Sequence, residues 1–359
     1  MKHLSKLALL AVVLVWMGIA RADEGLVVVK QLNDIQDMAC VIPESQDHTV
    51  VMRMINYRIN NHGQTPAELA LTLSNHDSFP DSTVAIHKID CGAVFDGNYA
   101  AATLAPGAQC GVSLLVRPPE CPANVYGEYQ PVLGDIHRVF QVVTNAGGHV
   151  VLPIDAQISA LGAAAAFGIL SPALHNEDAL GPVKVHHGDV GSLATMGSVL
   201  VTDGEHHQDG AYPTLVALQD LQSASRVFRS NQGCSNLDYD LSNAALPPGV
   251  YCLNGHSVSN HSTLTLNGEG IYVFYVDYEG FYLGQYAKVL LDKGAHADNV
   301  YWIVDNRLHL ELESTIVGNI LVARSVPYQH FGDLSKIKGR VLSLDTLSLY
   351  GNRVMVPQN

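Results

Sequence analysis

Basic residues are scarce in this sequence. It has 20 Lys and Arg against 34 Asp and Glu among 359 residues, a formal net charge of −14. If the first 22 residues are removed, as proposed below, Lys2, Lys6 and Arg21 go with them and the formal charge becomes −17. A chain this acidic repels nucleic acid and anionic lipid, so we expect neither as a partner unless bridging cations or a local patch intervene.

Long hydrophobic runs are also missing, apart from one near the start. Leu7 to Ile19 is uninterrupted, but at about 13 residues it is shorter than the roughly 20 that cross a bilayer. Lys2, His3 and Lys6 precede it and Ala20-Arg21-Ala22 follows, which is the pattern of a signal peptide cleaved after Ala22. We therefore expect an exported chain, periplasmic or extracellular, with no membrane span after cleavage.

No C-x-x-C pair occurs among the six cysteines, which favours disulfides over zinc in an exported chain. Cys234 and Cys252 are the only two in the C-terminal half, so we expect them to pair. The other four allow three connectivities, and we favour the one that joins Cys91 with Cys110 and Cys40 with Cys121.

Catalytic constellations are absent as well. No Ser-His-Asp elbow, carboxylate pair or phosphate-binding loop stands in the context that its chemistry requires, so we expect no enzyme. Two polar clusters, His186 to Asp189 and Glu205 to Asp209, contain metal-ligand side chains. Neither has the four-ligand spacing of structural zinc, so we interpret them as solvated turns and expect no metal or cofactor.

The first half of the chain is rich in short β-forming runs separated by turn signals. Seven such runs predict an Ig-like β-sandwich over residues 23–160: Leu26 to Val29, Val50 to Tyr57, Leu69 to Leu73, Val84 to Ile89, Val112 to Val116, Val139 to Val143 and Val150 to Ile154. The segment from Thr103 to Pro118 resembles a strand-turn-strand hairpin of Ig-like modules in bacterial surface and secreted proteins, with Cys110 placed to staple the sheet. The small-residue run Gly162 to Ala166 marks the boundary to a second domain, 161–359.

That second domain combines one helix with many short strands. Ala217, Leu221, Ala224 and Phe228 form an apolar face at helical spacing, which predicts a helix over Pro213 to Arg229. Strands of about five residues, bounded by Gly, Asn or Asp, suggest the rungs of a solenoid: Thr263 to Leu266, Ile271 to Val276, Lys288 to Leu291, Val300 to Val304, Leu308 to Leu312, Ile316 to Val322, Ile337 to Leu344 and Leu347 to Leu349.

An ordered series of motifs in this domain resembles the ice-binding-like family. The matching segments are Phe167 to Ser171, Gly188 to Gly191, Leu246 to Tyr251, Ser262 to Gly268, Asn299 to Trp302, Val317 to Leu321 and Gly339 to Ser343. The resemblance implies a right-handed, discontinuous β-solenoid with one long helix packed alongside. Together with the first half, it makes the predicted fold class all-β.

The resemblance also implies candidate site residues. Members that adsorb to ice use a flat face of short outward side chains, and Thr263 and Thr265 suit such a face because both point away from Leu264 and Leu266. His309, Glu311 and Glu313 take what we expect to be the corresponding positions of a later rung, where their bulk and charge disturb flatness.

A second candidate is an aromatic patch. The stretch from Tyr272 to Tyr286 holds seven aromatic residues, and some of these rings are expected to stand outward, as candidates Tyr278, Tyr282 and Tyr286. Ordinary packing of strand tyrosines is the alternative.

Three hypotheses follow. In the first, the protein adsorbs to ice or another extended surface through one solenoid face. In the second, it is an extracellular adhesion module that binds glycan or protein at a cell surface through the aromatic patch. In the third, both domains are structural.

Overall fold

The computed structural model describes most of the chain, in two compact units. The described residues are 19–21, 26–30, 38–40, 53–74, 84–91, 94–96, 99–121, 134–144, 149–176, 181–208, 212–230, 233–235, 237–322, 330–331 and 334–358. One unit comprises residues 1–121 and 132–160, and the other 122–131 and 161–359. The predicted signal peptide lies outside the described residues except for Ile19–Arg21, which form strand β1, and its cleavage stays a prediction.

The N-terminal unit contains two antiparallel sheets. The first has the order β1-β2-β3-β8-β5 and the second β10-β9-β4-β7-β6. Their strands, after β1, are β2 Leu26–Lys30, β3 Arg53–Asn61, β4 Ala67–Ser74, β5 Val84–Ile89, β6 Val94–Asp96, β7 Tyr99–Leu104, β8 Gln109–Val116, β9 Gly134–Thr144 and β10 His149–Ile158. All seven expected runs contain a strand.

Both sheets of this unit contribute to one apolar core. Ile59 and Leu114 from the first sheet, and Leu71 and Phe140 from the second, are fully buried in the same cluster. The alternation of buried and less buried residues along β3 and β8 gives the first sheet one core-facing side. The Ig-like assignment of this pair of sheets stays a prediction.

The prediction that the chain forms a hairpin around the Pro106-Gly107 turn is wrong. β7 pairs with β4 and β8 pairs with β3 and β5, so the turn carries the chain from one sheet to the other. A Pro-Gly turn reverses the chain in either case, and the sequence around it does not specify the pairing partners. The disulfides Cys91–Cys110 and Cys40–Cys121 are the pairings favoured from the sequence, as is Cys234–Cys252 in the other unit.

The C-terminal unit is a coil of short parallel strands that form three faces. The first face has the order β14-β12-β29-β27-β25-β22-β19-β16. Its strands are β12 Val183–His186, β14 Val199–Thr202, β16 Ala245–Leu246, β19 Thr263–Asn267, β22 Lys288–Asp292, β29 Arg353–Met355 and the first halves of β25 Thr315–Val322 and β27 Lys336–Ser343.

The other two faces complete each turn. The second face contains β15 His206–His207, β17 Gly249–Leu253, β20 Tyr272–Val276, β23 Val300–Val304, the second halves of β25 and β27, and the starts of β11 Phe167–Asn176 and β13 Asp189–Met196. The third contains β18 His256–Val258, β21 Phe281–Leu283, β24 Leu308–Leu310, β26 His330–Phe331 and β28 Leu347–Leu349, the last paired with the end of β11. The right-handed winding stays a prediction.

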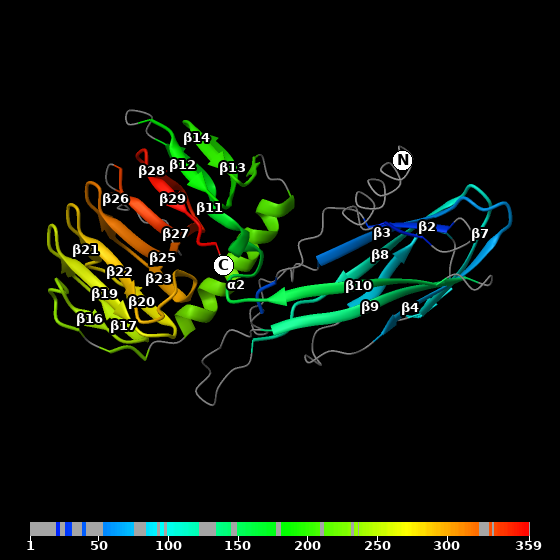
Figure 1. Ribbon diagram of the computed structural model, residues 1–359, viewed down its shortest axis with the longest axis horizontal. Helices are drawn as coiled ribbons and strands as arrows, with labels where there is room; N and C mark the ends of the chain where they lie inside the picture. Colours follow the sequence, from blue (N-terminus) through cyan, green and yellow to red (C-terminus); the bar gives the residue numbers. More distant parts are fainter. Residues whose placement is uncertain are drawn as a thin grey trace, which may run out of the picture. The chain divides into compact units, whose positions relative to one another are not determined.

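The coil is discontinuous in sequence. Strands β11 and β12 pair with β27, β28 and β29 near the C-terminus, so the first and last strands of the unit are neighbours, drawn in green and red in Figure 1. Helix α2, Tyr212–Ser230, lies between β15 and β16 in the chain. At about 1.5 Å per residue it is roughly 28 Å long, which is close to the roughly 34 Å spanned by eight strands. The helix therefore carries the chain along the stack to its other end.

Helix α2 buries one side against the second face. Leu221 and Phe228 are buried, as the helical spacing predicts, and the ring of Phe228 lies 4.6 Å from that of Tyr301 on β23. Burial there raises the pKa of Tyr301 to about 12. The short 3-10 helix η1, Gly162–Ala166, joins the same layer because the N–H of Ala163 donates to Asp220 of α2 at 2.7 Å.

Aromatic rings and leucines fill the interior of the coil. Phe274 stacks on Trp302 at 4.2 Å between ring centroids, and Phe281 stacks on the same indole at 5.3 Å. The indole N–H of Trp302 donates to the carbonyl of Val317 at 2.8 Å, so its polar atom is satisfied. The alternating leucines Leu308 and Leu310 are fully buried, as expected from their period of two.

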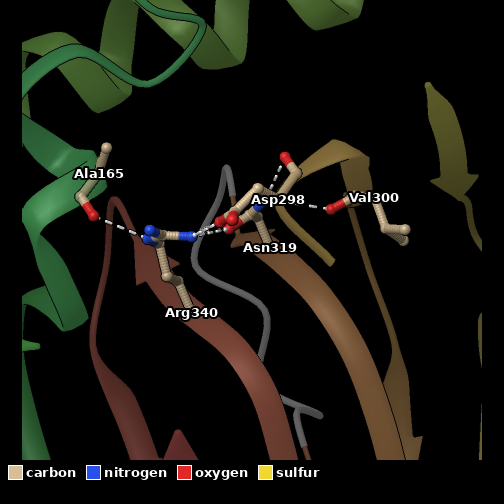
Figure 2. A network of polar contacts seen from close by, with 5 residues as sticks. All are labelled: Ala165, Asp298, Val300, Asn319 and Arg340. Atoms are coloured by element: carbon tan, nitrogen blue, oxygen red, sulfur yellow. Dashed lines mark hydrogen bonds and ion pairs between the residues drawn. The ribbon is translucent and has the colours of Figure 1, made fainter. Parts of the chain in front are cut away.

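A buried polar network joins four segments at the second face (Figure 2). Arg340 of β27 donates to the carbonyl of Ala165 at 2.8 Å, to Asp298 at 2.5 Å and to the side chain of Asn319 at 2.9 Å. Asn319 of β25 in turn donates to the carbonyls of Asp298 and Val300. Two of the motif segments, Val317 to Leu321 and Gly339 to Ser343, thus supply the amide and the guanidinium that fix η1 and η3, Ala297–Asn299.

Replacing Arg340 with Met tests this network. The change leaves the Asp298 carboxylate, the Asn319 oxygen and the Ala165 carbonyl without their donor. We expect the unfolding free energy to fall by about 2 kcal/mol, less than the roughly 3–5 kcal/mol for a fully buried pair, because Asp298 keeps 35% side-chain exposure. Urea unfolding followed by Trp302 fluorescence measures it, and Arg353→Met, on the exposed surface of β29, is the control with an expected change within about 0.5 kcal/mol. Equal losses in the two variants would contradict the assignment.

Candidate functional site

The first face carries Thr263 and Thr265 on its outer side. Both are partly exposed on β19, whereas Leu264 and Leu266 between and beyond them are fully buried. The register places Thr263 beside Lys288, and Thr265 between Ala245 and Leu290. The two threonines therefore share a surface with one short side chain, Ala245, on one flank and with a lysine and a leucine on the other.

The later-rung residues expected to oppose them lie elsewhere. His309 projects from β24 on the third face, where it pairs with Glu311 at 2.8 Å. Glu313 stands at the corner before β25. The expectation that His309 and Glu311 share the threonine face is wrong, because the chain turns a corner between β24 and β25.

One outer row of the first face is largely cationic. Following the register from β19 to β12, its members are Thr263, Lys288, Thr315, Lys336, Arg353 and Lys184. Lys338 lies two residues along β27, beside Met355. Sequence reasoning missed these cations, because strands distant in the chain bring them together. The signal that identifies Lys288, Lys336 and Arg353 is their place as the first residue of a strand, two residues after a corner residue with positive φ.

The corner before each described strand of the first face contains one residue in the left-handed backbone conformation. The residue two positions before each strand has φ between 52° and 92°: Gly197, Gly181, Gly351, Leu334, Glu313, Tyr286, His261 and Asn243. Glycine adopts this conformation without strain, but a bulky side chain costs on the order of 1–3 kcal/mol. Tyr286 and His261 therefore occupy strained positions at the edge of the first face.

These corner residues border a hollow of about 340 Å³. It is lined by His261, Ser262, Thr263, Tyr286, Lys288, Glu313, Thr315 and Lys336. The rings of His261 and Tyr286 stack with centroids 5.0 Å apart and planes 10° apart. Hydroxyls, two lysines, one carboxylate and a ring pair thus meet at one place, a lining suited to a polar ligand.

The aromatic patch candidates are all exposed but do not form one cluster. Tyr278 is 78% exposed in the connection before β21, Tyr282 is 38% exposed on the third face and Tyr286 is 39% exposed at the corner. Tyr282 packs on His309, and burial with Glu311 nearby raises its pKa. Tyr272, Phe274 and Phe281 of the same stretch are buried, so packing accounts for those three rings.

The histidine clusters hold turns together. His207 contacts Asp189 at 3.1 Å, and Asp189 also accepts from the N–H of Glu205. Burial and the neighbouring His207 lower the pKa of His206. Within the described part of the chain, no group of three or more His, Cys, Asp or Glu could hold a metal ion. No helix among the described residues is long and apolar enough to span a membrane.

Comparison with known proteins identifies the family of this coil. Residues 179–355 match the model of the ice-binding-like family. The C-terminal unit therefore belongs to that family, and the resemblance recognised in its motifs is confirmed. No curated protein matches the chain.

Solved ice-binding proteins also resemble this chain over 55% of its length. That from the Antarctic ascomycete Antarctomyces psychrotrophicus is 23% identical over 98% of its own chain, with a TM-score of 0.44. That from an Antarctic Flavobacteriaceae bacterium is 27% identical over 47% of its chain (TM-score 0.45), and that from an Arctic yeast is 23% identical over 94% (TM-score 0.46).

Because the corner residue Leu334 has a left-handed backbone, we expect that replacing it with glycine stabilises the protein. Leu334→Gly removes a left-handed leucine that is 44% exposed, and we expect a gain in unfolding free energy of roughly 0.5–1 kcal/mol. Leu290→Gly is the matched control, since Leu290 is 42% exposed but lies in extended β22, and it should lose about 1 kcal/mol. Urea unfolding of both variants measures these two changes. A lower unfolding free energy in both variants would show that the corner at Leu334 is unstrained.

Proposed function

We propose that the C-terminal unit adsorbs to an extended, regular surface through its first face, and that this surface is ice. Membership of the ice-binding-like family supports ice as the ligand. The observation that carries the choice of face is its regularity: parallel strands in register, about 4.8 Å apart, present Ala245, Thr263, Thr265 and Asn267 at the β16–β19 end. Because a β-sheet is already rigid, adsorption orders few side chains.

The export that the N-terminal sequence predicts belongs to the same proposal. An exported protein meets ice outside the cell, and the three disulfides suit an oxidising compartment. The chain acts here by adsorption and not by catalysis. The N-terminal unit, as an Ig-like module, presents the adsorbing unit.

Thermal hysteresis and ice recrystallisation assays test adsorption. The intact chain should shape ice, slow its growth and enter a growing ice hemisphere. Thr265→Tyr places a bulky ring in the middle of the short-side-chain area and should remove most of the hysteresis. Ser257→Tyr, on the third face between Asp240 and Tyr282, is the control and should retain it. Exclusion of the wild-type chain from the hemisphere would refute ice as the ligand.

A second function is recognition of a glycan or protein through the exposed tyrosines. The outward positions of Tyr278, Tyr282 and Tyr286 favour it, because exposed tyrosines bury large area on binding at little entropic cost.

Glycan arrays and pull-downs with Tyr278→Ala, Tyr282→Ala and Tyr286→Ala test this second function. Truncation of a contacting tyrosine should weaken binding by about 2 kcal/mol, or roughly 30-fold. Tyr99→Ala, an exposed tyrosine of the N-terminal unit, is the control. Unchanged binding in all three variants would remove the tyrosines as a site.

A further inference from the structure

Five basic side chains project from the first face in an otherwise acidic protein. They are Lys184, Lys288, Lys336, Lys338 and Arg353. Residues 161–359 contain 11 Lys and Arg in all, so nearly half of the unit's cations stand on one face. Lys336 is in register with Arg353, and Arg353 with Lys184, which makes three cations direct neighbours on adjacent strands.

This arrangement is unfavourable for the isolated protein. Like charges directly opposite one another on neighbouring strands destabilise a sheet. None of the five forms an ion pair with a described residue. Strands β12, β25, β27 and β29 contain no Asp or Glu, whereas Lys288 shares β22 with Asp292 and has Glu313 across the hollow. An anion from outside the chain would supply the counter-charge that the strands of Lys184, Lys336, Lys338 and Arg353 lack.

We propose that this cationic row binds a linear acidic polysaccharide that runs across the strands. From β22 to β12 the row extends over four strand spacings, roughly 19 Å, which suits several consecutive sugar units. The hollow at its β19–β25 end adds the hydroxyls of Thr263 and Thr315 and the stacked ring of Tyr286, groups that bind sugar hydroxyls and sugar faces.

The surroundings of the row favour a polyuronate over a nucleic acid. Glu313 lines the hollow, and the chain as a whole is strongly acidic, which opposes a densely charged duplex. A polysaccharide with one charge per sugar is less densely charged than a duplex, so Glu313 and the acidic chain repel it less. Its hydroxyls would lie beside Ser262 and Thr263. This inference does not depend on adsorption to ice, because it is measured by a different ligand in the absence of ice.

Alginate oligomers in calcium-free buffer are the probe, with neutral dextran and single-stranded DNA beside them. Calorimetric titration of the full chain should show alginate binding that weakens with salt, with a log–log slope of roughly −3 for four or five contacts at about −0.7 each. Dextran should not bind, and DNA should bind more weakly than alginate. Binding of DNA more tightly than alginate, or no binding of alginate at low salt, would overturn the proposal.

A charge-matched pair of variants locates the site. Removing four of the five first-face cations, three from the row and its neighbour Lys338 (Lys184→Ser, Lys336→Ser, Lys338→Ser and Arg353→Ser), should weaken alginate binding at least about tenfold. Because the changes relieve like-charge repulsion, the unfolding midpoint should not fall. Removing four exposed cations elsewhere (Arg58→Ser, Lys88→Ser, Arg117→Ser and Arg307→Ser) should preserve binding to within about twofold. Equal loss in both variants would show attraction by net charge alone and refute a site on the first face.

Discussion

The coil of the C-terminal unit depends on one backbone constraint, a left-handed residue at the corner before each first-face strand. From Asn243 to Gly351 this residue stands two positions before the strand that follows. It turns the chain sharply enough that the next strand begins in register with its neighbours. Because register fixes which side chains point inward, the corner also determines that Leu264 is buried and Thr263 is exposed. The outer rows of the first face follow from that repeated geometry.

The interior of the coil determines its stability, and the exterior determines the chemistry of its surface. Inside, Phe274, Phe281 and Trp302 stack along the axis, and buried polar atoms such as those of Arg340 and Asn319 are paired within the protein. These contacts stabilise the stack and leave the ligand unspecified. On the outside, the side chains of one row differ in chemistry, from Thr263 to Lys288 to Arg353. The backbone hydrogen bonds between the strands do not depend on these side chains. One scaffold therefore combines a hydroxyl-bearing area with a cationic one.

Local patterns in the sequence predicted the elements well, because each depends on nearby residues. The spacing of Leu221 and Phe228 placed the helix, and the alternation at Leu308 and Leu310 placed inward leucines. Faces were harder to predict. His309 was assigned to the threonine face because sequence alone does not show where a strand ends and a corner begins. The pairing of β12 with β29 joins Lys184 to Arg353 across more than 160 residues, and no local pattern indicates such a neighbour.

Two features of the first face cost stability without improving packing: bulky residues in a left-handed conformation and cations placed side by side. Glycine occupies the corner at Gly181, Gly197 and Gly351, so the fold accepts the unstrained residue, yet His261 and Tyr286 stand in the same position where the hollow lies. Strain and like-charge repulsion both coincide with exposed polar surface, and neither is needed to close the coil. Strain lies at the corners before β19 and β22, and repulsion lies across β27, β29 and β12. Both point to the outer surface of this face, between β19 and β12, as the part of the molecule shaped by what it binds.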